Sequence, residues 1–248
     1  MRTIFALVFV LAAAGSAHAQ QPPPPSPDFF FGRPHGSLAV RGSWIFARAQ
    51  SDLFEFVERE LTIDKGNFDR AALAADYGIA LTPRADAVVG FEVNRASIGS
   101  EYRNLVDNNR QPIEQTTSLI EMSLSGNLRL ALTPRGREIG RFAWVPYAVV
   151  PYAGAGGGML WYRFQQSGDF VDALDPRLAV FTDTFTAGGW TPSGQVFGGL
   201  DVKLGQRWFL TVDGRYLWAA GPLGNDFENF DPIDLAGFRV GAGINILF

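Results

Sequence analysis

Apolar and polar residues alternate along eight stretches of the chain, and the C-terminal stretch is the most regular. From Phe238 to Phe248 every second residue is apolar, whereas the residues between are polar or glycine, with Leu247 as the exception. A period of two indicates a β-strand with two different faces. The preceding stretches of this kind are residues 37–50, 70–82, 86–97, 116–132, 145–165, 192–204 and 207–219. Each stretch reaches the roughly 9–11 residues that a tilted transmembrane strand needs.

The links between these stretches alternate in length. Shorter links lie near residues 83–85, 133–144 and 205–206, and long loops near 51–69, 98–115, 166–191 and 220–234. Short turns at one rim and long loops at the other are typical of outer-membrane barrels, which must close because lipid offers no partner to an open sheet edge. The pattern therefore predicts an all-β fold, an eight-stranded antiparallel up-and-down transmembrane β-barrel.

The N-terminal residues have a different composition. Arg2, the apolar run from Ile4 to Ala14 and the sequence Ala17-His18-Ala19 resemble a cleavable signal peptide, since the run is too short to cross a bilayer as a helix. A proline-rich stretch follows, which we expect to be an extended spacer. The predicted segments are a signal peptide at 1–19, a spacer at 20–35 and the barrel at 36–248.

Composition excludes several classes of protein. The chain has no cysteine, so it carries neither a lipid-modified cysteine anchor nor disulfides. Its formal net charge is −4, and this mild acidity argues against nucleic-acid binding.

The eight strands, the signal peptide, the terminal Phe248 and the stretch from Pro151 to Gly156 together resemble small outer-membrane barrels of the OmpA/OmpX and opacity-protein type. The resemblance covers roughly residues 36–248 and implies a location in the outer membrane of a Gram-negative-type cell. It also implies that the barrel-insertion machinery reads the last strand. The matching positions are Phe238, Val240, Ile244, Ile246 and Phe248. Nothing follows this strand, so we expect no peptidoglycan-binding domain.

A secreted barrel is the alternative. Gly42-Ser43-Trp44 resembles the first-strand motif of lipocalins, which point apolar residues inward around a ligand. Alternation alone leaves the direction of the two faces open. Aromatic residues near the predicted strand ends favour the membrane, where they would form interfacial girdles. They are Trp144, Tyr147, Tyr162, Trp208, Tyr216 and Trp218.

If the apolar faces meet lipid, the polar faces fill the lumen with equal numbers of acids and bases. The predicted lumen charges are Arg41, Asp76, Glu92, Glu121, Arg129, Asp201, Lys203, Asp213, Arg215 and Arg239. An eight-stranded barrel is just wide enough for its interior side chains, and unpaired buried ions cost several kcal/mol. We therefore expect a lumen plugged by ion pairs and a structural or surface-interaction role. The alternative is a narrow, porin-like ion path along the same residues.

The sequence offers no catalytic centre. His18 leaves with the predicted signal peptide, and His35 lies before the first strand. Without cysteine and a usable histidine, nucleophilic catalysis lacks its common groups. We expect no enzyme activity, no metal and no cofactor. The expected partners of the monomeric barrel are outer-membrane lipid and lipopolysaccharide, the barrel-insertion machinery and an extracellular ligand held by the four long loops, whose aromatic residues either make such contacts or pack against one another.

Overall fold

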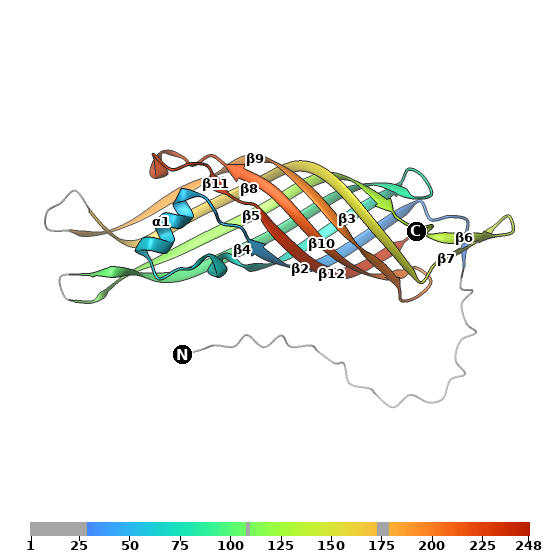
Figure 1. The fold of residues 1–248 in the computed structure, drawn as a ribbon, viewed down its shortest axis with the longest axis horizontal. Coiled ribbons are helices and arrows are strands. Elements are labelled where there is room, and N and C mark those ends of the chain that lie inside the picture. The colour runs from blue at the N-terminus through green and yellow to red at the C-terminus, as the bar shows by residue number, and fades with distance from the viewer. Residues whose placement is uncertain (1–28, 108–109, 173–178) are drawn as a thin grey trace, which may run out of the picture.

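Eight antiparallel strands form a closed ring in the computed structural model (Figure 1). The structure describes residues 29–107, 110–172 and 179–248, so the predicted signal peptide and residues 20–28 of the predicted spacer lie outside it. The ring strands are β2 (Gly36–Ala47), β3 (Arg70–Ala80), β4 (Ala85–Val106), β5 (Pro112–Ala131), β8 (Val149–Val171), β9 (Val180–Lys203), β10 (Trp208–Gly221) and β12 (Gly237–Leu247). Each pairs with the next in this order, and β12 pairs with β2, for example through Val240 opposite Trp44. The predicted fold is confirmed.

The two ends of the ring differ. One end, which we call the turn end, holds the start of β2, the C-terminus and the links at residues 81–84, 132–148 and 204–207. A small sheet of β1 (Phe30–Phe31), β7 (Ala143–Pro146) and β6 (Gly136–Ile139) projects from it. The opposite end, the loop end, carries α1 (Asp52–Glu60), η1 (Lys65–Phe68), η2 (Asn225–Phe227) and β11 (Ile233–Asp234). In the described part of the chain, no helix is long and apolar enough to cross a membrane.

Four strands are much longer than the sequence pattern predicts. β4 and β5 pair out to Val106 opposite Pro112, and β8 and β9 pair out to Val171 opposite Val180. The neighbouring pairs stop earlier, at Ala72 opposite Asn94 on one side. The predicted loops 98–115 and 166–191 are therefore wrong for most of their length. The strands escaped prediction because the outer face of these extensions lies beyond the apolar part of the barrel and is polar, so the alternation is interrupted there.

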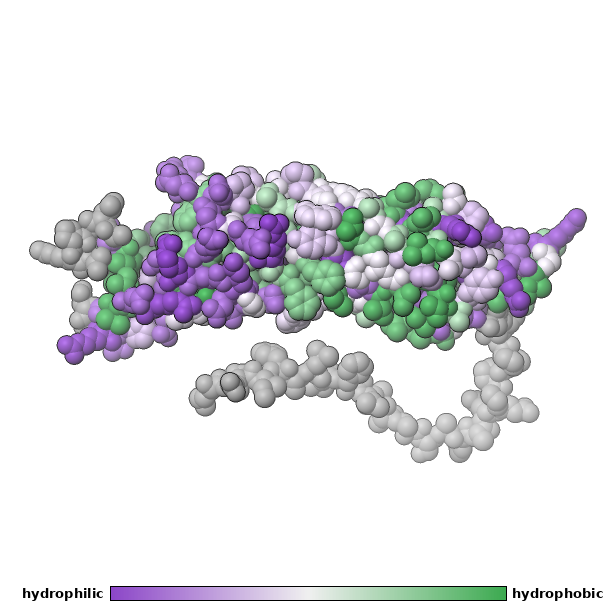
Figure 2. All heavy atoms as spheres, viewed as in Figure 1, coloured by the Kyte–Doolittle hydropathy of each residue, from purple (hydrophilic) through white to green (hydrophobic). Residues whose placement is uncertain are grey.

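Large apolar side chains cover the outside of the ring between the two ends. This surface, which we call the apolar belt, appears as the green region of Figure 2. Its exposed members include Leu38, Val40, Trp44, Phe46, Leu73, Tyr77, Ile79, Val89, Phe91, Leu124, Leu128, Leu130, Val196, Leu200, Val212, Phe238, Val240 and Ile244. A lipocalin would turn these residues inward. The facing in the ring is the opposite.

The inside of the ring changes character at the loop end. Leu119, Leu160 and Phe164 continue the inward-facing rows of β5 and β8, and they pack with α1, η1 and η2 in one apolar core. Phe54 of α1 contacts Phe164, their ring centroids lying 6.3 Å apart, and Phe227 contacts Phe164 at 5.5 Å. Segments 48–69 and 222–236 therefore close the loop end with buried apolar side chains.

The aromatic residues that were predicted to form the girdle lie partly on the belt and partly in the interior. Trp208 and Trp218 lie exposed at opposite ends of β10, as an interfacial girdle requires. Trp144 and Tyr162 are buried, so their assignment to the girdle is wrong. Trp144 packs against Phe30 in the small sheet, and Tyr162 belongs to the apolar core. Strand-end position alone could not reveal that these two rings turn inward.

Candidate functional site

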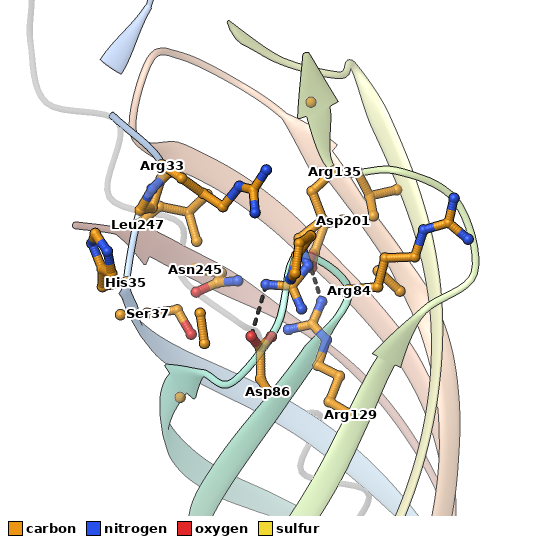
Figure 3. A pocket seen from close by; sticks show the side chains of 18 of the residues that line it. Arg33, His35, Ser37, Arg84, Asp86, Arg129, Arg135, Asp201, Asn245 and Leu247 are labelled. Atoms are coloured by element: carbon orange, nitrogen blue, oxygen red, sulfur yellow. Dashed lines mark hydrogen bonds and ion pairs between the residues drawn. The ribbon is translucent and has the colours of Figure 1, made fainter. Parts of the chain in front are cut away.

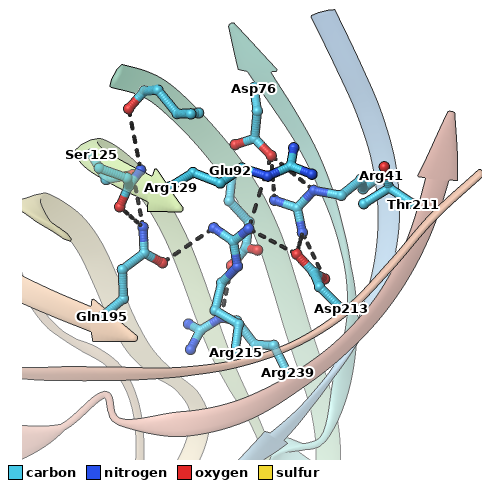
Figure 4. A network of polar contacts seen from close by, with 12 residues as sticks. Arg41, Asp76, Glu92, Ser125, Arg129, Gln195, Thr211, Asp213, Arg215 and Arg239 are labelled. Atoms are coloured by element: carbon cyan, nitrogen blue, oxygen red, sulfur yellow. Dashed lines mark hydrogen bonds and ion pairs between the residues drawn. The ribbon is translucent and has the colours of Figure 1, made fainter. Parts of the chain in front are cut away.

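The lumen of the ring holds a network of charged side chains that is centred on Arg41 of β2 (Figure 4). Its guanidinium lies 2.8 Å from Oδ2 of Asp76 on β3 and 2.9 Å from Oδ2 of Asp213 on β10. Arg215 lies 3.0 Å from the same Asp213 oxygen and 3.9 Å from Asp76. The alternation of each strand turns these positions inward, and the narrow interior brings them together. Two arginines thus share two carboxylates.

A second group lies beside the first. Arg239 of β12 donates through Nε to Oε1 of Glu92 at 2.8 Å, and its Nη2 lies 3.7 Å from Glu121. Arg70, at the start of β3, forms an ion pair with Glu121 and donates to the Asn94 side chain. Glu121 is only 1% exposed and Arg239 only 2%. Such ions must be paired, because an uncompensated charge at this depth costs several kcal/mol.

A third group lies toward the turn end. Arg129 pairs with Asp201, which also accepts a hydrogen bond from the Thr211 hydroxyl at 2.6 Å. The Arg129 guanidinium carbon lies 3.6 Å from the ring centre of Tyr152, a cation–π contact. Lys203, the last residue of β9, is partly exposed.

Direct ion pairs form among the predicted lumen charges Arg41, Asp76, Glu92, Glu121, Arg129, Asp201, Asp213, Arg215 and Arg239, with Arg70 added, and Lys203 also has an interaction partner. Sequence reasoning missed Arg70, Asp86 and Arg135. The alternation of β3 and β4 could have found the first two, since Arg70 continues the inward row of Asp76, and Asp86 that of Glu92. Arg135 comes from the link after β5, and it reaches Asp86 at 2.7 Å. No alternation applies to a link, so only the folded chain reveals this residue.

Neutral polar side chains complete the wall between the charged groups. Nε2 of Gln195 donates to Oγ of Ser125 at 3.0 Å and to Oδ1 of Asn127 at 2.7 Å, and its own Oε1 accepts from Arg215 at 3.3 Å. A buried amide of this kind fixes the neighbouring guanidinium, since it offers donors and an acceptor at once.

A cavity of about 160 Å³ opens at the turn end, beneath the small sheet (Figure 3). Arg129 and Arg135 lie in its wall with their partners Asp201 and Asp86, and apolar side chains such as Trp144 complete the lining. Deeper in the lumen the cavities shrink to about 30 and about 10 Å³. A volume near 10–15 Å³ holds about one water molecule. The interior therefore narrows from an open mouth to single-water spaces, and the apolar core lies beyond them.

The predicted insertion residues lie along the outside of β12. Phe238, Val240, Ile244 and Phe248 are exposed, and Ile246 is partly buried. Phe248 lies over the start of β2, since its N–H donates to the carbonyl of Gly36 at 3.0 Å. The intervening Arg239 and Asn245 point into the lumen and are buried. His35 is exposed at the turn end, and the described residues contain no group of three or more acidic, histidine or cysteine side chains that could hold a metal ion.

The chain matches no protein-family model, and no curated protein sequence matches it significantly. Among solved structures it is similar to Neisserial surface protein A, with 13% identity over 86% of this chain and 96% of that one and a TM-score of 0.47. The outer membrane protein OprG of Pseudomonas aeruginosa gives 13% identity over 88% and 99%, with a TM-score of 0.43. Ail, the attachment invasion locus protein of Yersinia pestis, gives 11% identity over 86% and 99%, with a TM-score of 0.43. Similarity at this level does not indicate an activity for this chain.

Proposed function

We propose that this chain is an integral outer-membrane β-barrel of structural or surface-interaction type, and that its lumen is closed. One observation carries the proposal: the ring turns its apolar side chains outward and its charges inward. Only a hydrocarbon surrounding makes that arrangement stable, because an exposed apolar band of this extent would aggregate in water. The turn end then faces the periplasm and the loop end the exterior, as short turns and long loops do in such barrels.

Two features support the closed lumen. The inward arginines Arg41, Arg70, Arg129, Arg135, Arg215 and Arg239 stand against the carboxylates Asp76, Asp86, Glu92, Glu121, Asp201 and Asp213, in equal numbers. A passing ion would have to break these pairs. Above them lies the apolar core, with Phe54 and Phe164, whose closely packed apolar side chains would not solvate a dehydrated ion.

Planar-bilayer recording of the purified full-length chain tests this proposal against the porin-like alternative. We expect no stable unitary conductance. A reproducible conductance step would instead establish an ion path through the network, and a larger step in Arg41→Ala would locate that path beside Arg41.

The absence of enzyme activity is likewise a proposal. The lumen arginines and carboxylates are occupied with one another, and the exposed His35 belongs to the periplasmic rim, where no carboxylate contacts it among the described residues. Incubation of radiolabelled lipid A with the purified barrel is the direct test. Release or transfer of label would show acyl or headgroup chemistry and would contradict the proposal.

A surface-interaction role would fall to the loop end. Most loop aromatics are buried there, which supports packing among the loops, whereas Phe56 and Phe181 remain exposed. We therefore expect Phe56→Ser and Phe181→Ser to leave the barrel folded and to weaken adhesion of intact cells to a surface partner. Deletion of residues 166–191 is unsuitable as a test, because it would remove parts of β8 and β9.

A further inference from the structure

Two outward arginines lie in one cross-strand row on the outer wall. Arg95 of β4 is directly opposite Ile120 of β5, which in turn is opposite Arg163 of β8. Both arginines are exposed, and the alternation of their strands places them on the same face as the belt residues Phe91 and Leu124. Two strand spacings separate their Cα atoms, roughly 10 Å. Two flexible guanidinium groups can reach one anion across that distance.

The row lies at the boundary of the apolar belt that is nearer the loop end. The next outward residues toward the turn end are Val93, Met122 and Trp161, and Trp161 is opposite the exposed Trp190. The next outward residues toward the loop end are Ser97, Ser118 and Gln165. Tryptophan at a border between apolar and polar rows marks the level of the lipid headgroups. The arginines therefore lie at headgroup depth.

Neither arginine has a countercharge of its own. No ion pair or side-chain hydrogen bond joins Arg95 or Arg163 to the residues that the structure describes, whereas Arg41, Arg129 and Arg239 in the lumen are all paired.

The nearest outward carboxylates on β4 and β5 are Glu101 and Glu114, opposite each other and six residues from the row, roughly 20 Å away. Asp226, next to β9, accepts the backbone N–H of Thr186 at 2.9 Å. An anion from outside the chain could therefore bind between the two guanidinium groups.

An apolar groove begins at the same place. It is shallow and opens outward, and Arg95 and Ile120 form part of its lining. The small outward residues Gly42, Ala71 and Ala242 contribute to its lining, beside Trp44 and Leu73. A Cβ atom added at Gly42 would meet no heavy atom within 4 Å. The groove is thus a shallow apolar hollow in the belt, along which a flexible hydrocarbon chain can lie.

We propose that Arg95 and Arg163 bind the phosphate of an acylated outer-leaflet lipid, and that one acyl chain of this lipid lies in the groove. The inference rests on the proposed function, since it takes the loop end to face the exterior. Arginine suits the phosphate because its planar guanidinium donates two parallel hydrogen bonds to two oxygens. The groove favours a lipid over a free phosphate, because only a lipid can lay an acyl chain along the apolar surface beside the charges.

Native mass spectrometry of the full-length chain in detergent tests the proposal, with bisphosphorylated lipid A and its fully dephosphorylated counterpart as probes. We expect the phosphorylated lipid to remain bound and the dephosphorylated one to be lost at the same concentration. Arg95→Gln and Arg163→Gln should each weaken retention about tenfold, since each removes hydrogen bonds to a charged group. Arg141→Gln, an exposed arginine at the turn end, is the matched control and should change nothing.

Gly42→Leu tests the groove, because a Cβ atom at this position meets no heavy atom within 4 Å and the longer side chain occupies the groove. Retention of lipid A by this variant should fall. For the wild-type chain, inorganic phosphate should compete poorly with lipid A. Equal retention of both lipids, or full retention by the Arg95→Gln/Arg163→Gln double variant, would overturn the proposal. Complete displacement by inorganic phosphate with no effect of Gly42→Leu would reassign the arginines to free phosphate.

Heat-dependent gel mobility after folding into phosphatidylcholine vesicles separates this inference from the proposed function. A chain that inserts without phosphate selectivity refutes only the lipid site. A chain that does not insert refutes the membrane barrel itself.

Discussion

Arg239 on the closing strand β12 donates from Nε to Oε1 of Glu92 on β4, 2.8 Å away, although β2 and β3 separate these strands in the sheet. The bond therefore crosses the lumen instead of following the wall. It ties the closing strand to a strand three positions away around the ring. Because both side chains are buried, each needs the other's charge. The two charges are neutralised only when β12 closes the ring.

Replacement of Arg239 should test that coupling. Arg239→Met leaves Glu92 without its arginine and Glu121 with one arginine fewer, so the free energy of unfolding should fall by about 3–5 kcal/mol. Urea titration of the barrel folded in vesicles measures the loss. The Arg239→Met/Glu92→Met double variant should lose less than the single variant, since it buries no uncompensated charge there. A double variant as unstable as the sum of both single variants would contradict the coupling.

The two faces of β12 should respond differently to substitution. Ile244 points outward into the belt, so Ile244→Arg places a charge in lipid at a cost of up to about 2–4 kcal/mol near the bilayer midplane. Asn245 is buried in the lumen, and its Oδ1 accepts no hydrogen bond, so Asn245→Ala should cost much less. The folded fraction in vesicles, read from heat-dependent gel mobility, compares them. Equal folded fractions would show that the facing of the strand is wrong.

Helix α1 should depend on one of its two phenylalanines. Phe54 is 1% exposed and packs edge-on against Phe68 at 4.8 Å, so Phe54→Ala should lower the free energy that holds the loop end closed by about 3–5 kcal/mol. Phe56 lies on the same helix but is 37% exposed, and Phe56→Ala is the control. Amide hydrogen exchange of residues 52–60 measures the effect. Similar exchange in both variants would argue against α1 as part of the core.

Two glycines that are close neighbours across β5 and β8 should tolerate alanine very differently. A Cβ at Gly156 would press against the Asn127 side chain and the Gly126 carbonyl, whereas a Cβ at Gly126 would meet nothing within 4 Å. Gly156→Ala should therefore destabilise the barrel by about 1–3 kcal/mol through overpacking, while Gly126→Ala should have little effect. Urea unfolding in vesicles compares them, and equal midpoints would exclude crowding at Gly156.

The alternation of residues predicted the eight strands of the ring and sorted their residues onto two faces, and the loop lengths and the aromatic residues near strand ends indicated which face meets lipid. In a barrel one face of every strand meets lipid and the other meets the lumen. Neighbouring residues such as Val240 and Arg239 therefore differ in polarity according to the face on which they lie. The same regularity assigned Arg41, Asp76, Glu92 and Asp213 to the interior. Periodicity needs only neighbours along one strand, and a single sequence contains them.

Only the tertiary structure decided which charges pair and what closes the loop end. Arg239 meets Glu92 from 147 positions away, and Arg135 reaches Asp86 from a link without periodicity, so their partners depend on the register of the whole ring. Phe54 and Phe164 meet because the long strands β4, β5, β8 and β9 extend beyond the belt, where polar residues on the outer face conceal the strand pattern. The row of Arg95 and Arg163 likewise exists only across strands. Alternation sorts the residues of each strand onto two faces, and the closed ring decides which side chains meet across the lumen.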